Sequence, residues 1–116
     1  MYAICLILND VSKLDDILEI FYENHCGATT VDSVGMGKIL INNNVDIPIF
    51  AGLRRILEGT KPYNKTIISV IREEPKLRKV IDTINTELDY NNNPGVGFLF
   101  VTPVLECHGL NLENIS

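Results

Sequence analysis

The sequence lacks the features by which several large classes of protein are recognised. It has no basic run longer than the pair Arg54–Arg55, and its fifteen acidic residues outnumber ten basic ones, giving a net charge of −5. Nucleic acid and anionic membranes are therefore poorly matched as partners. The first apolar run stops at Asn9, too short for a bilayer, and no basic leader precedes it. These absences predict a soluble, cytoplasmic protein without membrane insertion.

Cysteine is also scarce, and the usual catalytic motifs are missing. The three cysteines, Cys5, Cys26 and Cys107, are an odd number without a CxxC pair, which favours reduced thiols over a disulfide framework. No GxSxG, HExxH or P-loop pattern occurs. The carboxylate pairs Asp15–Asp16 and Glu73–Glu74 stand at expected helix starts, where the helix dipole favours negative charge. We therefore predict that the chain is not an enzyme.

What the sequence does contain is an alternation of short apolar runs with amphipathic stretches, over a length that suits one domain, residues 1–116. The first helix is expected after Ser12, which with Asp15 can form a capping-box-like start. The second has Pro75 in its first turn. Predicted strands cover Tyr2 to Leu8, Thr29 to Val34, Thr66 to Ile71 and Gly97 to Thr102; the predicted helical stripes are Leu14, Ile17, Leu18, Phe21 and Tyr22, and Leu77, Val80, Ile81, Ile84 and Leu88.

This order of elements predicts an α+β fold of the ferredoxin-like, split βαβ kind. Its four-stranded antiparallel sheet carries two helices on one face. A long insertion, about residues 36–64, separates the second and third strands. It holds an apolar stripe that includes Phe50 and Leu53, flanked by Arg54 and Arg55, which predicts a short helix that docks on the protein itself or on a partner.

The strands are apolar on both faces. In the first strand, Ala3, Cys5 and Ile7 alternate with Ile4, Leu6 and Leu8. Two helices cover one face only, and an apolar face of that size is rarely left exposed. We therefore predict an obligate homo-oligomer that packs sheet to sheet.

Two histidine–cysteine pairs have the ligand types of a tetrahedral zinc site. His25 and Cys26 end the first helix, Cys107 and His108 follow the last strand, and the topology brings both pairs to the same end of the sheet. The alternative is a partly buried thiol beside a surface imidazole, because adjacent residues seldom direct both side chains at one ion.

Three segments, in this order, resemble the PII signal-transduction family (nitrogen regulatory protein PII), and its divergent PII-like members in particular. They are KLDDILEIF at 13–21, GATTVDSVGMGK at 27–38 and PGVGFLFVTPV at 94–104. The resemblance implies a homotrimer with clefts between subunits that bind a small effector, an adenine nucleotide or another small anion. It also implies that the long loop contacts a target protein.

The same resemblance assigns residues to these tasks. Gly35, Gly37, Gly95 and Gly97 would lie near the effector, and bare glycine N–H groups can approach phosphate oxygens closely. Lys38 would supply positive charge. Phe50, Leu53, Arg54 and Arg55 would belong to the partner-binding loop.

The chain departs from the family at charged positions. Phe98 stands where the family has a lysine, Ile39 stands where it has a glutamine, and the segment after the last strand has no arginine. These departures argue against the family's ordinary sensing of ATP together with 2-oxoglutarate, and they leave the identity of the effector open. The alternatives are a CutA-like trimeric protein that binds divalent metal through His25, Cys26, Cys107 and His108, and an accessory interaction protein without a ligand.

Overall fold

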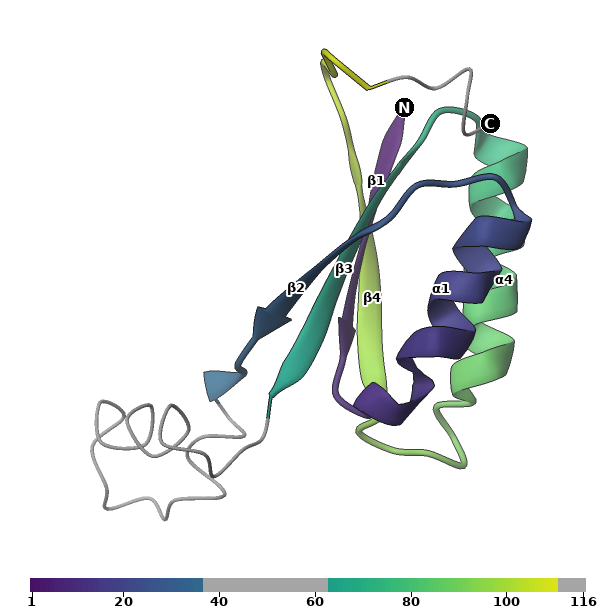
Figure 1. The fold of residues 1–116 in the computed structure, drawn as a ribbon. Coiled ribbons are helices and arrows are strands. Elements are labelled where there is room, and N and C mark those ends of the chain that lie inside the picture. Colours follow the sequence, from purple (N-terminus) through teal and green to yellow (C-terminus); the bar gives the residue numbers. More distant parts are fainter. Residues whose placement is uncertain (37–62, 111–116) are drawn as a thin grey trace.

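The computed structural model describes residues 1–36 and 63–110 (Figure 1). The prediction for the insertion and its short helix therefore lies almost entirely outside the described residues. In chain order the elements are β1 (Tyr2–Leu8), the 3-10 helix η1 (Val11–Lys13), α1 (Leu14–Glu23), β2 (Thr29–Ser33), β3 (Asn64–Ile71), α4 (Glu74–Leu88) and β4 (Gly97–Pro103).

The four strands form one sheet in the order β2-β3-β1-β4, and each neighbouring pair is antiparallel. Helices α1 and α4 lie side by side on the same face of this sheet (Figure 1). The predicted α+β, ferredoxin-like architecture is confirmed. This topology places β1 and β3 in the centre and leaves β2 and β4 as the edges.

Strand β4 runs one residue further than predicted and includes Pro103. The backbone pairing explains why a proline is tolerated there. Asn9 N–H donates to the carbonyl oxygen of Val96, and Val104 N–H donates to that of Met1, so even-numbered residues turn their polar groups toward β1. The missing N–H of Pro103 therefore falls on the free edge, where no ladder bond is lost.

Helix α1 differs from its prediction in two details. The capping side chain is Asp10, which precedes the helical segment. Its Oδ1 accepts from Ser12 N at 3.2 Å and from Ser12 Oγ at 2.6 Å. Tyr22 is 81% exposed rather than packed on the sheet, because Ile17, Ile20 and Phe21 already fill the inward face.

Within residues 1–36 and 63–110, the helices are too short or too polar to cross a membrane.

The core lies between the two helices and one face of the sheet. Alternate residues of β1, namely Ile4, Leu6 and Leu8, are fully buried there against Ile84 of α4 and other apolar side chains. The predicted α4 stripe is confirmed in full, since all its members are buried: Leu77, Val80, Ile81, Ile84 and Leu88.

Among the helices of residues 1–36 and 63–110, none lies on the opposite face of the sheet (Figure 1). Cys5 of β1 lies between Ile68 of β3 and Phe100 of β4 in the register, and Ile7 lies opposite Phe98. Phe98 is 55% exposed and Phe100 49%, with Ile68 also exposed. We call this surface the open face, defined by Cys5, Ile7, Val31, Ile68, Phe98 and Phe100. It matches the second apolar face expected from the sequence.

Candidate functional site

The described glycines of the predicted effector site lie at one end of the sheet. Gly35 follows the end of β2, whereas Gly95 and Gly97 stand at the start of β4. A Cβ placed on Gly35 would lie 3.5 Å from Nδ2 of Asn64, the first residue of β3. Gly37 and Lys38 lie outside the described residues.

A chain of hydrogen bonds connects these two glycine segments across the sheet. Ser33 Oγ on β2 donates to Asn64 Oδ1 at 2.5 Å. Asn64 Nδ2 donates to Asn9 Oδ1 at 3.1 Å, and Asn9 Nδ2 donates to the carbonyl oxygen of Gly95 at 3.2 Å. The four groups follow the strand order β2-β3-β1-β4, so each of these strands takes part at this one end of the sheet. We call this chain, Ser33–Asn64–Asn9–Gly95, the asparagine relay.

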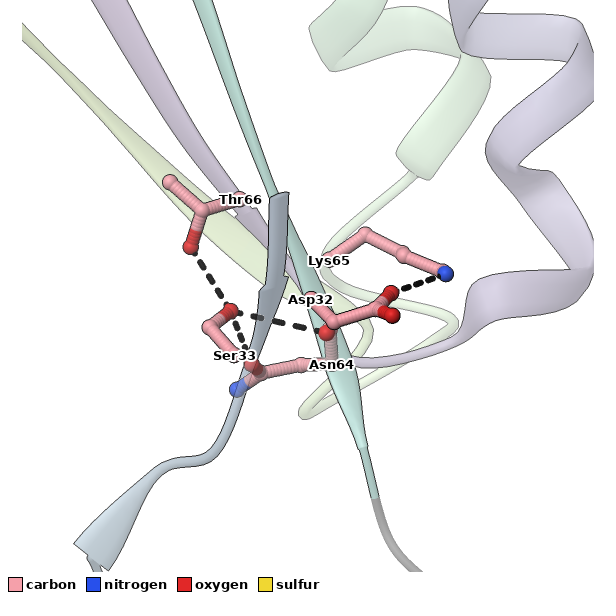
Figure 2. Close-up of polar contacts among 5 residues, drawn as sticks. All are labelled: Asp32, Ser33, Asn64, Lys65 and Thr66. Atoms are coloured by element: carbon pink, nitrogen blue, oxygen red, sulfur yellow. Dashed lines mark hydrogen bonds and ion pairs between the residues drawn. The ribbon is translucent and has the colours of Figure 1, made fainter. Parts of the chain in front are cut away.

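The start of the relay is fixed by its neighbours on β2 and β3 (Figure 2). The Ser33 hydroxyl also lies 2.8 Å from Oγ1 of Thr66, and a side-chain ion pair joins Asp32 to Lys65. Asn64 is only 3% exposed. An amide buried to this degree is costly unless its polar atoms are paired, and both polar atoms of this side chain are.

The far end of the relay borders an open hollow of about 280 Å³. It is lined by Asn9, Asp10, Asn93, Pro94, Gly95 and Val96. Its side-chain polar groups are carboxamides and one carboxylate, and the described lining has no basic residue. A phosphate bound here would need a cation from elsewhere, such as Lys38, because Lys65 is already paired with Asp32.

The loop before β4 is held firmly at the same place. Asn93 Nδ2 donates to the carbonyl oxygen of Leu88 at 3.1 Å, which caps the end of α4, and Val96 N–H donates back to the carbonyl of Asn93 at 3.1 Å. Two main-chain N–H groups, of Asn9 and Asp10, converge on the Val96 carbonyl at 2.9 and 3.0 Å. The hollow is therefore built on hydrogen-bonded backbone at the junction of β1, α4 and β4.

The predicted partner-binding residues Phe50, Leu53, Arg54 and Arg55 all lie outside the described residues. The segment that carries them nevertheless leaves and re-enters the described fold at the relay. Gly35 and Asn64 flank it and are close to each other.

The four predicted metal ligands are not gathered into a cluster within one chain. His25 and Cys26 precede β2, whereas Cys107 and His108 follow β4, and these strands are opposite edges of the sheet. Across residues 1–36 and 63–110, no three His, Cys, Asp or Glu side chains come together in a way that could hold a metal ion. The His108 imidazole instead lies 3.1 Å from Glu106 Oε1, and both side chains are exposed.

The surroundings of Cys26 lead to a prediction. Burial raises the pKa of its thiol, and the charge of Lys76 on α4 lowers it in part. Lys76→Ala should therefore raise the pKa of Cys26 further. Since the thiolate is the form that reacts, alkylation of Cys26 by iodoacetamide should slow roughly two- to threefold at about pH 8. The effect is this small because a partly exposed charge contributes only tenths of a kcal/mol. The rate is measured with Cys5 and Cys107 replaced by serine.

Lys79→Ala is the matched control for this measurement, because it removes the same charge from the same helix. An alkylation rate that is unchanged in Lys76→Ala, or equally slowed in both variants, would contradict the assignment.

Neither the protein-family models nor the curated proteins contain a match to this chain. The site is therefore defined by its own geometry. Sequence reasoning missed its two central residues, Asn9 and Asn64, because an asparagine beside a strand is normally a sign of a turn. The available signal was positional: Asn9 ends the first predicted strand at the end of the sheet where the last strand begins, and Asn64 ends the long insertion.

Proposed function

We propose that this chain is a PII-like regulatory protein of the cytoplasm. It acts as a homotrimer that binds a small effector, an adenine nucleotide or another small anion, in clefts between subunits. The long segment between β2 and β3 responds to the effector and regulates a target protein. The observation that carries this proposal is the asparagine relay, a chain of hydrogen bonds that joins the end of β2, beside Gly35, to the carbonyl oxygen of Gly95.

Two further features support it. The open face exposes Ile68, Phe98 and Phe100 together, and a second copy of the same chain supplies an equally apolar surface to cover them. The segment between β2 and β3 leaves after Gly35 and returns at Asn64, so a ligand in the hollow would be connected to the base of this segment through the hydrogen bonds of the relay. A molecule with different affinity for two arrangements of that segment would shift their populations, which is the signal.

The charges and polar groups of the hollow suit one part of an effector and not another. The lining of amides and main-chain groups suits a hydrogen-bonding, uncharged part such as a base or a sugar, whereas Asp10 repels phosphate. The anionic part would then need a cation, and Lys38 or a basic residue of a neighbouring subunit is the candidate to supply it. The proposal therefore predicts that removing Lys38 weakens binding of anions.

Thermal unfolding against a ligand panel tests this function. The panel contains adenine nucleotides, cyclic dinucleotides, bicarbonate and divalent metal ions. A true effector at about a hundred times its dissociation constant adds about 2.7 kcal/mol to the free energy of unfolding, which raises Tm by roughly 10 °C or more in a domain of this size. Lys38→Ala should lose most of that rise, and Lys79→Ala should keep it.

The opposing outcome is equally clear. If no nucleotide or anion raises Tm while Zn²⁺ does, and His25→Ala and His108→Ala abolish the zinc response, the chain is a metal-binding protein. The sites of neighbouring subunits would then have to supply the ligands that one chain keeps apart.

A further inference from the structure

Each asparagine of the relay is bonded to a different partner through each end of its carboxamide. In Asn64, the carbonyl oxygen accepts from Ser33 while the amide nitrogen donates to Asn9. In Asn9, the oxygen accepts from Asn64 while the nitrogen donates to Gly95. Turning over either carboxamide exchanges its donor and acceptor ends. The two amides are therefore oriented together or not at all.

The relay also connects two places that have different neighbours. At one end, Asn9 and Gly95 line the hollow. At the other, Ser33 and Asn64 hold the ends of β2 and β3, next to Gly35. A ligand that takes up the Gly95 carbonyl or the Asn9 amide in the hollow removes one bond of the chain and leaves the next amide with an altered partner.

We infer that Asn9 and Asn64 are positioning residues that transmit occupancy of the hollow to the base of the segment between β2 and β3. This inference rests on the proposed effector function and names the route by which that function reaches the loop. Asn64 does not touch the hollow, and Asn9 does not touch Ser33 or Gly35 through any hydrogen bond of the relay. Each nevertheless controls the far end through the other.

Isosteric substitutions break the relay at chosen bonds. Asn64→Asp keeps the oxygen that accepts from Ser33 but removes the donor to Asn9, and Asn9→Asp keeps the acceptor for Asn64 but removes the donor to Gly95. Asn85→Asp is the matched control. It makes the same change of charge, but within the described part of the chain the Asn85 side chain only accepts, through Oδ1, from the Tyr90 hydroxyl at 2.8 Å, so no hydrogen bond is lost there.

Amide NMR spectra and hydrogen exchange measure the transmission. In Asn64→Asp, the amide of Val96, which bonds to Asn93, should exchange about fivefold faster, as expected for the loss of one typical hydrogen bond in its support. In Asn9→Asp, the amide resonance of Gly35 should move further than in Asn85→Asp. Unchanged resonances from the middle of α4 would show that each variant keeps the fold.

A titration with ATP as the probe adds the ligand. In the unaltered protein, ATP should shift the amide resonances of both Val96 and Gly35. In either relay variant, ATP should shift only the resonances on the side of the relay where it binds. Effects of the substitutions that stop at the altered strand, or that match those of Asn85→Asp, overturn the inference. If ATP shifts no amide resonance, the effector is not this nucleotide. The effects of the two substitutions in the free protein then decide whether the relay transmits a change.

Discussion

A protein carrying Phe100→Asp is expected to behave as a monomer of 13.0 kDa, whereas the unaltered chain is expected at about 39 kDa, three times that mass. Phe100 is 49% exposed and lies opposite Cys5 near the middle of the open face. Burying the exposed half of a phenylalanine contributes about 1 kcal/mol per subunit. A carboxylate left without a partner in that interface costs considerably more, so the charge decides the outcome.

Light scattering coupled to size-exclusion chromatography makes this measurement directly. Tyr22→Asp is the control, because it makes the same aromatic-to-acid change at a side chain that is 81% exposed on α1, the element on the other side of the sheet. This control should keep the mass of the unaltered protein. A monomeric unaltered chain, or an assembly that survives Phe100→Asp, would show that the open face is not the subunit interface.

Gly97→Ala is expected to destabilise the fold by about 2–3 kcal/mol, through overpacking against backbone that cannot move aside. A Cβ at this position would lie 2.5 Å from the carbonyl oxygen of Ile7 and 3.2 Å from Cα of Leu8, both in the central strand β1. Relieving these contacts requires β1 and β4 to separate where the hollow is built. The register between Leu8 and Gly97 would be disturbed first.

Gly95→Ala provides the comparison two residues away. Gly95 has a φ of +80°, which disfavours a side chain, but a Cβ there meets nothing within 4 Å. Its cost is therefore that of the left-handed backbone alone, about 1 kcal/mol. Urea unfolding at one fixed protein concentration separates the two effects, because association also contributes to stability. Equal losses in both variants would mean that the strands can part at no cost.

The fold was largely predictable from the sequence because burial imposes a period on each element. Leu77 to Leu88 repeat at helical spacing and are buried as expected, and the alternation in β1 places Ile4, Leu6 and Leu8 in the core. Tyr22 shows the limit of that reasoning. It lies at the margin of the helical stripe, and only the actual position of α1 on the sheet decides which marginal residue is covered.

The candidate site was predictable only in part. The glycine patterns indicated where the backbone can approach a ligand, but the partners of Asn9 and Asn64 could not be read from the sequence. These two residues are 55 positions apart, and their contact depends on the register of β1 against β3 and on the rotamers of both amides. The Asp10 cap was similarly hidden, since Ser12 is an equally good capping residue by type.

The asparagine relay is made of one hydroxyl, two carboxamides and a main-chain carbonyl. None of these groups gains or loses a proton between about pH 5 and 9, in contrast to a chain built from histidine or carboxylate side chains. Acidification of the surroundings would therefore leave the connection between its two ends intact. The proposed transmission would respond to a ligand in the hollow and not to a change in proton concentration.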